Sequence, residues 1–136
     1  MRIVSLVPSL TEYLWALGLD AEVVGITKFC VHPNTWWQEK KRVGGTKQLN
    51  FQAIDALQPT LLIGNKEENH KADIEHLSRK YEVLLTEIYT IDDAYAAMIQ
   101  IGTAVGKCDD AQRIVADLKL RQSQIQRLDT PQTYLY

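Results

Sequence analysis

Imidazole and carboxylate side chains are concentrated in residues 64–77, which read GNKEENHKADIEHL. Groups of this kind bind Zn²⁺ and related ions, so the first chemistry to test is a metal site formed by His70, Asp73 and His76. On a helix, residues six positions apart are separated by about 9 Å along the axis and by about 120° around it. Metal–nitrogen bonds of about 2.1 Å cannot span that separation. We therefore predict no metal ligand in this stretch.

The same stretch is typical of a helix start in contact with water. Glu67 and Glu68 are expected near the helix N-terminus, where the helix dipole stabilises carboxylates. Asp73 is expected to form a local pair with His76 or with a basic neighbour. These roles are structural and involve no bound ion.

A second candidate centre is the pair Cys30 and His32, two positions apart in a segment with no periodic pattern. In an extended chain this spacing directs both side chains to one face, as a thiolate–imidazole nucleophile requires. The sequence identifies no third group to orient the imidazole, so we predict a packed thiol and a hydrogen-bonded histidine. Cys108 is also expected to be reduced and mostly buried, because two cysteines are too few for a disulfide framework.

Residues 43–47 (VGGTK) have the composition of a glycine turn beside a lysine. Phosphate-binding loops follow the patterns G-x-x-x-x-G-K-[ST] or G-x-G-x-x-G, and neither is present. A G-x-S-x-G nucleophile elbow is absent as well. The glycines instead predict a tight turn or the close approach of a ligand. We predict no catalytic residue and no cofactor.

Length and composition fit one globular domain, with 136 residues of which 46% are hydrophobic and 24% charged. A formal net charge of −2 gives no overall attraction to nucleic acid or anionic lipid, and the basic trio at 40–42 is interpreted as solvated surface. No segment reaches the roughly 20 apolar residues of a membrane helix. The N-terminus lacks the cleavage site of a secretory signal, so the sequence as written is expected to stay in the cytoplasm.

Short apolar runs alternate with segments of helical periodicity. Strands are predicted at 3–7, 22–26, 42–46, 60–64 and 82–87. Helices are predicted at 9–18, 50–59, within 64–81, at 90–106 and at 109–128. Three of them start with a capping pair, namely Ser9–Glu12, Thr90–Asp93 and Asp109–Gln112, and Asn50 caps a fourth. The helix within 64–81 has Ile74, Leu77 and Tyr81 on one face. The segment 27–41 is predicted to be irregular, with Trp36 and Trp37 exposed.

This alternation predicts an α/β fold, namely a Rossmann-like lobe with a mainly parallel sheet followed by a long helix. Each return between parallel strands needs a crossover, which is normally a helix. In such sheets ligands bind at the carboxyl ends of the strands. Those ends are predicted at 8–9, 27–33, 44–49, 64–69 and 86–90.

Four segments in fixed order carry a family resemblance: RIVSLVPSLTEYLWALGL, EVVGIT, RVGGTKQLNFQAIDALQPTLLIGNKEEN and EVLLTE. Together they resemble the N-terminal lobe of the helical-backbone substrate-binding proteins, which bind vitamin B12, iron–siderophores or haem for bacterial ABC importers. The resemblance implies two α/β lobes joined by one rigid helix, with the ligand between them. It identifies residues 1–107 as the N-terminal ligand-binding lobe, 108–129 as the interlobe helix and 130–136 as the start of a missing second lobe.

The resemblance also implies a set of ligand-binding residues. Phe29 matches an aromatic side chain that flanks the corrin in the vitamin B12 binders, and His32 matches a nearby aromatic position. Thr46 and Asn65 stand where those proteins carry Trp, so this sequence favours a polar, metal-bearing ligand such as a ferric siderophore over cobalamin. The full predicted set is Ser9, Phe29, His32, Thr46, Lys47, Asn65, Lys66 and Glu67.

We therefore expect a lobe that captures an iron–siderophore, haem or a corrinoid without catalysis, in the periplasm or at a membrane, with an ABC permease as partner. The family's transporter-docking glutamate falls on Gln52, which removes the carboxylate of that contact. Two alternatives remain open. One is a cytoplasmic α/β enzyme that uses Cys30 and His32 or the acidic segment. The other is a self-associating interaction module that uses Trp36 and Trp37.

Overall fold

Five parallel strands form the central sheet of the computed structural model, which describes residues 1–125. They stand in the order β3-β2-β1-β6-β7, with bounds β1 Ile3–Ser5, β2 Val23–Ile26, β3 Lys41–Arg42, β6 Leu61–Asn65 and β7 Glu82–Thr86. Strands β4 (Gly44–Gly45) and β5 (Gln48–Leu49) form a separate antiparallel hairpin. The predicted parallel α/β fold is confirmed, whereas the strand expected at 42–46 is divided between β3 and the hairpin.

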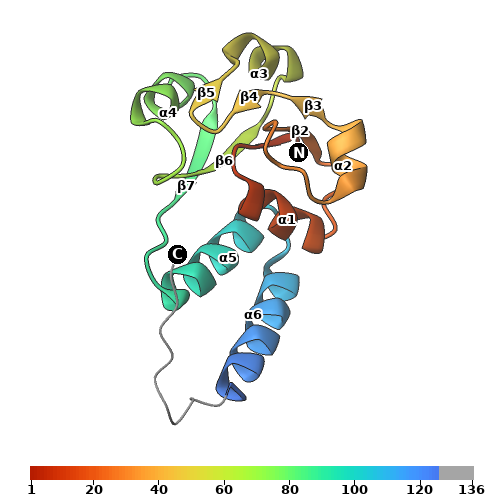
Figure 1. The fold of residues 1–136 in the computed structure, drawn as a ribbon, viewed down its shortest axis with the longest axis vertical. Helices are drawn as coiled ribbons and strands as arrows, with labels where there is room; N and C mark the ends of the chain where they lie inside the picture. Colours follow the sequence, from red (N-terminus) through yellow and green to blue (C-terminus); the bar gives the residue numbers. More distant parts are fainter. Residues whose placement is uncertain (126–136) are drawn as a thin grey trace, which may run out of the picture.

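Helices cover both faces of this sheet (Figure 1). Their bounds are α1 Pro8–Ala16, α2 Asn34–Glu39, α3 Phe51–Leu57, α4 Lys71–Leu77, α5 Ile91–Ala104 and α6 Cys108–Ser123. Helices α3 and α4 lie on one side, with α1 and α5 on the other, while α6 leads away from the sheet. The Tyr13 hydroxyl donates to the Met98 carbonyl oxygen (3.0 Å) and so ties α1 to α5.

Strands β1 and β6 are buried on both faces, which is why they read as continuous apolar runs. From β1 the chain moves outward to β2 and β3 and then returns to β6 on the other side of β1. Beyond the end of β1, the Leu6 amide still donates to the Ile63 carbonyl oxygen (2.9 Å). In doubly wound sheets the ligand crevice lies at the carboxyl ends of the strands beside such a reversal.

Two of the predicted helix caps are confirmed. The Asn50 side chain accepts a hydrogen bond from the Ala53 amide (3.0 Å) at the start of α3. At the start of α5, Thr90 and Asp93 form a full capping box, with the Thr90 amide donating to the Asp93 carboxylate at 2.9 Å. These short-range signals were readable because both partners lie within one helical turn.

Two other predicted caps are wrong. Helix α1 has Val7 as its N-cap, so Ser9 lies inside the first turn and forms no capping box with Glu12. Pro8 at the first helical position starts this helix instead, because its fixed φ suits a helix and it has no amide proton to satisfy. Helix α6 begins one residue before the predicted Asp109 cap, and its N-cap Lys107 makes no side-chain hydrogen bond.

Helix α4 starts later than expected, so Glu67 and Glu68 precede it rather than occupying its first turn. They lie in the turn that follows β6. The ion pair on this helix joins Lys71 to Glu75 at 3.7 Å and leaves out Asp73, which was expected to form the local pair.

The segment predicted to be irregular contains helix α2, and the prediction that both tryptophans are exposed is wrong. Trp36 is 1% exposed, and its indole N–H donates to the Asp20 carboxylate. Trp37 is half-buried beneath the Arg42 guanidinium, whose central carbon lies 4.0 Å from the ring centre. The tryptophan surface proposed for self-association is therefore not present in the described structure.

Helix α6 ends at Ser123 and is shorter than predicted. Its last turn is closed by the Gln124 amide, which donates to the Arg121 carbonyl oxygen, and by the Ile125 amide, which donates to the Gln122 carbonyl oxygen. Residues 126–136, which include the end of the predicted interlobe helix and the predicted start of a second lobe, lie outside the described residues. Among the helices of residues 1–125, none has the length and apolar character needed to cross a membrane.

Candidate ligand-binding site

The β4–β5 hairpin lies beside the loop that follows β2 at the carboxyl edge of the sheet. Its turn consists of Thr46 and Lys47, because Gly45 pairs with Gln48. Gly44 starts the hairpin with a φ of +96°, and a Cβ there would lie 2.4 Å from the Gln48 carbonyl oxygen. Only glycine fits this position. The tight turn that was predicted is present, but Gly44 and Gly45 form strand β4 beside it and the turn itself is made by Thr46 and Lys47.

A hollow of about 310 Å³ opens between this hairpin and the loop after β2. Its lining consists of Lys28, Phe29, Gly45, Thr46, Lys47 and Gln48. The Phe29 ring is 52% exposed, and the Lys28 ammonium nitrogen lies 5.1 Å from its centre. The structure thus brings together three of the residues predicted to bind ligand, Phe29, Thr46 and Lys47.

Beneath this loop lies a cluster of buried hydroxyl and thiol groups, which we call the hydroxyl–thiol cluster and define as Ser5, Thr11, Thr27 and Cys30. All four residues are 0% exposed. Thr11 Oγ1 lies 2.7 Å from Ser5 Oγ, 2.9 Å from the Val7 carbonyl oxygen and 3.1 Å from Cys30 Sγ. Thr27 Oγ1 lies 3.1 Å from the same sulfur.

The hydroxyl–thiol cluster needs no charged group. The single hydroxyl proton of Thr11 points toward three acceptors, namely the Ser5 hydroxyl oxygen, the Val7 carbonyl oxygen and the Cys30 sulfur, while the Ser5 hydroxyl donates to the Val7 carbonyl oxygen (3.3 Å). The thiol is thereby committed to internal hydrogen bonds and closed to solvent, whereas His32 is exposed. The prediction of a packed Cys30 is confirmed, and these positions do not assemble a thiolate–imidazole nucleophile.

At the end of β6, Asn65 is 7% exposed and its side chain is engaged internally. Its Oδ1 accepts from the Glu67 amide (2.7 Å), and its Nδ2 donates to Thr86 Oγ1 (3.4 Å). Thr86 Oγ1 in turn donates to the Gly64 carbonyl oxygen (3.1 Å). The Asn65 side chain therefore links the ends of β6 and β7 and is not free to bind a ligand. Glu67, whose amide donates to it, is exposed.

The ends of β6 and β7 carry an exposed charged cluster formed by Lys66, Glu87 and Tyr89. Lys66 forms an ion pair with Glu87, and the Tyr89 hydroxyl donates to the same carboxylate (2.9 Å). The Lys66 hydrogen bond, followed by that of Tyr89, holds the pKa of Glu87 below its ordinary value, and Glu87 raises the pKa of Lys66. The hydrogen bond to Glu87 also raises the pKa of Tyr89.

Ser9 lies apart from the Phe29 hollow, in a groove between α1 and α5. The groove is lined by Ser9, Leu10, Tyr13, Ile88, Ala94, Ala97, Met98 and Ile101. Its lining is largely apolar, and burial raises the pKa of Tyr13 to about 12. The carboxyl edge therefore has three separate parts: the Phe29 hollow, the Lys66 cluster and this groove.

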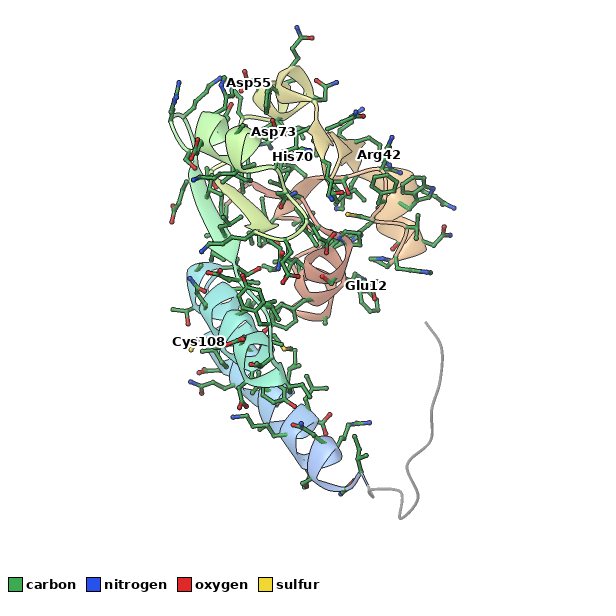
Figure 2. The ribbon with its side chains drawn as sticks, turned by 60° about the vertical axis from the view of Figure 1, so that its left-hand side comes forward. Glu12, Arg42, Asp55, His70, Asp73 and Cys108 are labelled. Atoms are coloured by element: carbon green, nitrogen blue, oxygen red, sulfur yellow. The ribbon has the colours of Figure 1, made fainter. Side chains whose placement is uncertain are left out.

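Sequence reasoning missed Lys28, Gln48, Glu87 and Tyr89 at this edge. Lys28 and Gln48 directly flank predicted residues, and Tyr89 lies in the strand end predicted at 86–90, so position alone could have indicated them. The residues considered for metal binding lie elsewhere. Figure 2 shows Asp73 beside the end of the molecule that carries Asp55, while Cys108 lies on the α5–α6 side. Within residues 1–125, no group of three His, Cys, Asp or Glu side chains is placed to hold a metal ion.

Comparison with known proteins gives a consistent match. Residues 3–127 match the model of a family described as periplasmic binding protein. A vitamin B12-binding protein of Pectobacterium atrosepticum is 24% identical over 94% of this chain and 46% of its own length. An uncharacterized ABC transporter substrate-binding lipoprotein of Bacillus subtilis, YvrC, is 31% identical over 92% of this chain and 40% of its own.

Among solved structures, a periplasmic heme-binding protein from Pseudomonas aeruginosa superposes with a TM-score of 0.82 at 25% identity, covering 90% of this chain and 44% of that protein. The chain spans about half the length of the curated relatives it matches. With the family model covering nearly all of the described residues, the chain belongs to the periplasmic binding protein family.

Proposed function

We propose that this chain is the ligand-binding lobe of an ABC-importer substrate-binding protein and that it captures a metal–organic chelate without making or breaking a bond. The observation that carries the proposal is the Phe29 hollow, which is placed at the carboxyl edge of a doubly wound sheet. Membership of the periplasmic binding protein family supports it. The buried thiol of Cys30 removes the nucleophile of the enzyme alternative.

The lining of the hollow favours an anionic chelate with a flat apolar part. Phe29 offers an exposed aromatic face, against which a planar ligand can stack. Lys28 and Lys47 border the same face and can pair with carboxylate or catecholate oxygens. Haem combines these features, ferric siderophores share the anionic oxygens and corrinoids share the flat surface. The proposed ligand is therefore an iron–siderophore, haem or a corrinoid.

The proposal includes a transport partner and a location. We propose an ABC permease as the partner and the periplasm or a membrane surface as the location. One relative is described as an ABC transporter substrate-binding lipoprotein and a similar solved structure as periplasmic, which supports both parts of the proposal. Gln52 is exposed in the first turn of α3, so it can contact a permease only through neutral hydrogen bonds. Replacing it as Gln52→Glu is expected to strengthen permease binding in a pull-down from detergent-solubilised membranes.

The test is isothermal titration calorimetry of the chain with hemin, ferrichrome and cyanocobalamin, each in a separate titration. At least one probe is expected to bind saturably, and Phe29→Ala is expected to weaken that binding about tenfold, because it removes the stacking face. Leu120→Ala, which truncates an equally exposed apolar side chain on α6, is the matched control and should leave affinity unchanged. Absence of saturable binding by all three probes would overturn the proposal, as would a turnover that Cys30→Ser abolishes.

A further inference from the structure

The side chain of Asn69 lies beneath the carboxyl edge and contacts three segments that are far apart in the sequence. It is 6% exposed. Its Nδ2 donates to the Thr46 carbonyl oxygen in the hairpin turn (3.0 Å) and to the Leu6 carbonyl oxygen after β1 (3.4 Å). Its Oδ1 accepts from the Asn65 amide at the end of β6 (3.0 Å).

An amide is the side-chain group that suits this position. The two N–H donors meet two backbone carbonyl groups, while the oxygen meets one backbone amide. A carboxylate would direct oxygen at both carbonyl groups. Gly64 leaves the space that Asn69 occupies, because a Cβ at that glycine would lie 2.6 Å from Asn69 Oδ1.

From these contacts we infer that Asn69 is a positioning residue of the ligand edge, which fixes the Thr46–Lys47 turn against the ends of β1 and β6. The hairpin has strands of only two residues, so its own ladder gives it little stability. The backbone of the turn is held from below by the Asn69 amide. The effect on ligand affinity rests on the proposed function, whereas the effect on the hairpin does not.

Hydrogen–deuterium exchange of the Asn69→Asp variant tests the inference without any ligand. The change removes both donors and retains the acceptor, so amides at 45–48 are expected to exchange about tenfold faster while the Asn65 amide stays protected. In Asn69→Ala both the hairpin and the Asn65 amide are expected to exchange faster. Unchanged exchange at 45–48 in Asn69→Asp would overturn the inference.

A double-variant cycle provides a second test, which remains informative if the Asn69→Asp variant folds poorly. Gly64→Ala is expected to displace Asn69 and accelerate exchange at 45–48. In the Asn69→Ala background the added methyl group has room, so the double variant should exchange no faster than Asn69→Ala alone. Independent, additive effects of the two changes would show that Gly64 does not act through Asn69.

The ligand readout uses hemin. Asn69→Asp is expected to bind hemin about tenfold more weakly than the unchanged chain, because a loosened turn no longer presents Thr46 and Lys47. Val115→Ala, which truncates a buried side chain of α6, lowers overall stability and should change neither hemin affinity nor exchange at 45–48. If Val115→Ala lost as much hemin affinity as Asn69→Asp, Asn69 would act only through the overall stability of the fold and the inference would be wrong. If the unchanged chain binds no hemin, haem is excluded as the proposed ligand, and exchange alone decides the role of Asn69.

Discussion

The two sides of the carboxyl edge are built on different physical principles. On one side, the loop that carries Phe29 is supported by the hydroxyl–thiol cluster, which is fully buried and uncharged. On the other side, Lys66 and Glu87 form an exposed ion pair, whose side chains are 50% and 43% accessible to solvent. The first side depends on shape and satisfied hydrogen bonds, and the second depends on charge.

This difference predicts how each side responds to its surroundings. A buried polar group that loses its partner suffers the full cost of desolvation, so the hydroxyl–thiol cluster is sensitive to single substitutions. An exposed ion pair is screened by salt and hydrated in either state, so the Lys66 cluster is insensitive to substitution and sensitive to solution conditions. The carboxyl edge of this chain therefore combines a rigid aromatic side with a charged side that responds to solution conditions.

The largest effect is expected from Thr11→Val, which preserves the shape of the side chain and removes its hydroxyl. Ser5 and Cys30 both lose a buried partner, so the free energy of unfolding should fall by about 2 kcal/mol. Urea denaturation measures this change. Thr35→Val, at an exposed position of α2, is the matched control. Equal losses in the two variants would show that the cluster does not support this side of the edge.

A smaller effect is expected from Cys30→Ala, because a thiol forms weaker hydrogen bonds than a hydroxyl. The loss should be about 1 kcal/mol, from the weak bonds to Thr11 and Thr27 and from the small cavity left behind. Cys108→Ala provides the comparison, because that sulfur is partly exposed and its partners Thr103 and Gln112 lie 3.7 and 3.6 Å away. If the two alanine variants have the same midpoint in urea, Cys30 is not part of a stabilising cluster.

The fold was largely predictable because its signals are local. Apolar runs gave all five sheet strands to within a few residues, and Asn50 and Thr90 marked helix starts with partners one turn away. Trp36 was not predictable in the same way, since its burial depends on Asp20, sixteen residues earlier. The split of the strand expected at 42–46 was also hidden, because it depends on the positive φ of Gly44.

The candidate site was only partly predictable. Phe29, Thr46 and Lys47 were indicated by strand ends and by family resemblance, and they share one hollow. Asn65 was expected to face the ligand because it ends a strand, but its amide is held by backbone and Thr86 groups. Asn69 lies in the strand end predicted at 64–69, but its role gave no signal, since two of its partners are separated from it by 23 and 63 residues. Side-chain positions that depend on such long-range contacts need the folded structure.

The smallest effect is expected from Glu87→Gln, which tests the charged side. At neutral pH and low salt the variant should be slightly less stable, and added salt should abolish the difference because exposed charges are screened. The Lys66 bond holds the pKa of Glu87 below its ordinary value of 4.5, so the contribution of the carboxylate is complete above pH 4.5 and is lost as pH falls through the lowered pKa. Urea denaturation across this range should therefore show the two chains converging in acid, whereas the Thr11→Val difference stays constant because its cluster carries no charge. A Glu87→Gln difference that is independent of both salt and pH would place this side of the edge in the same class as the buried one.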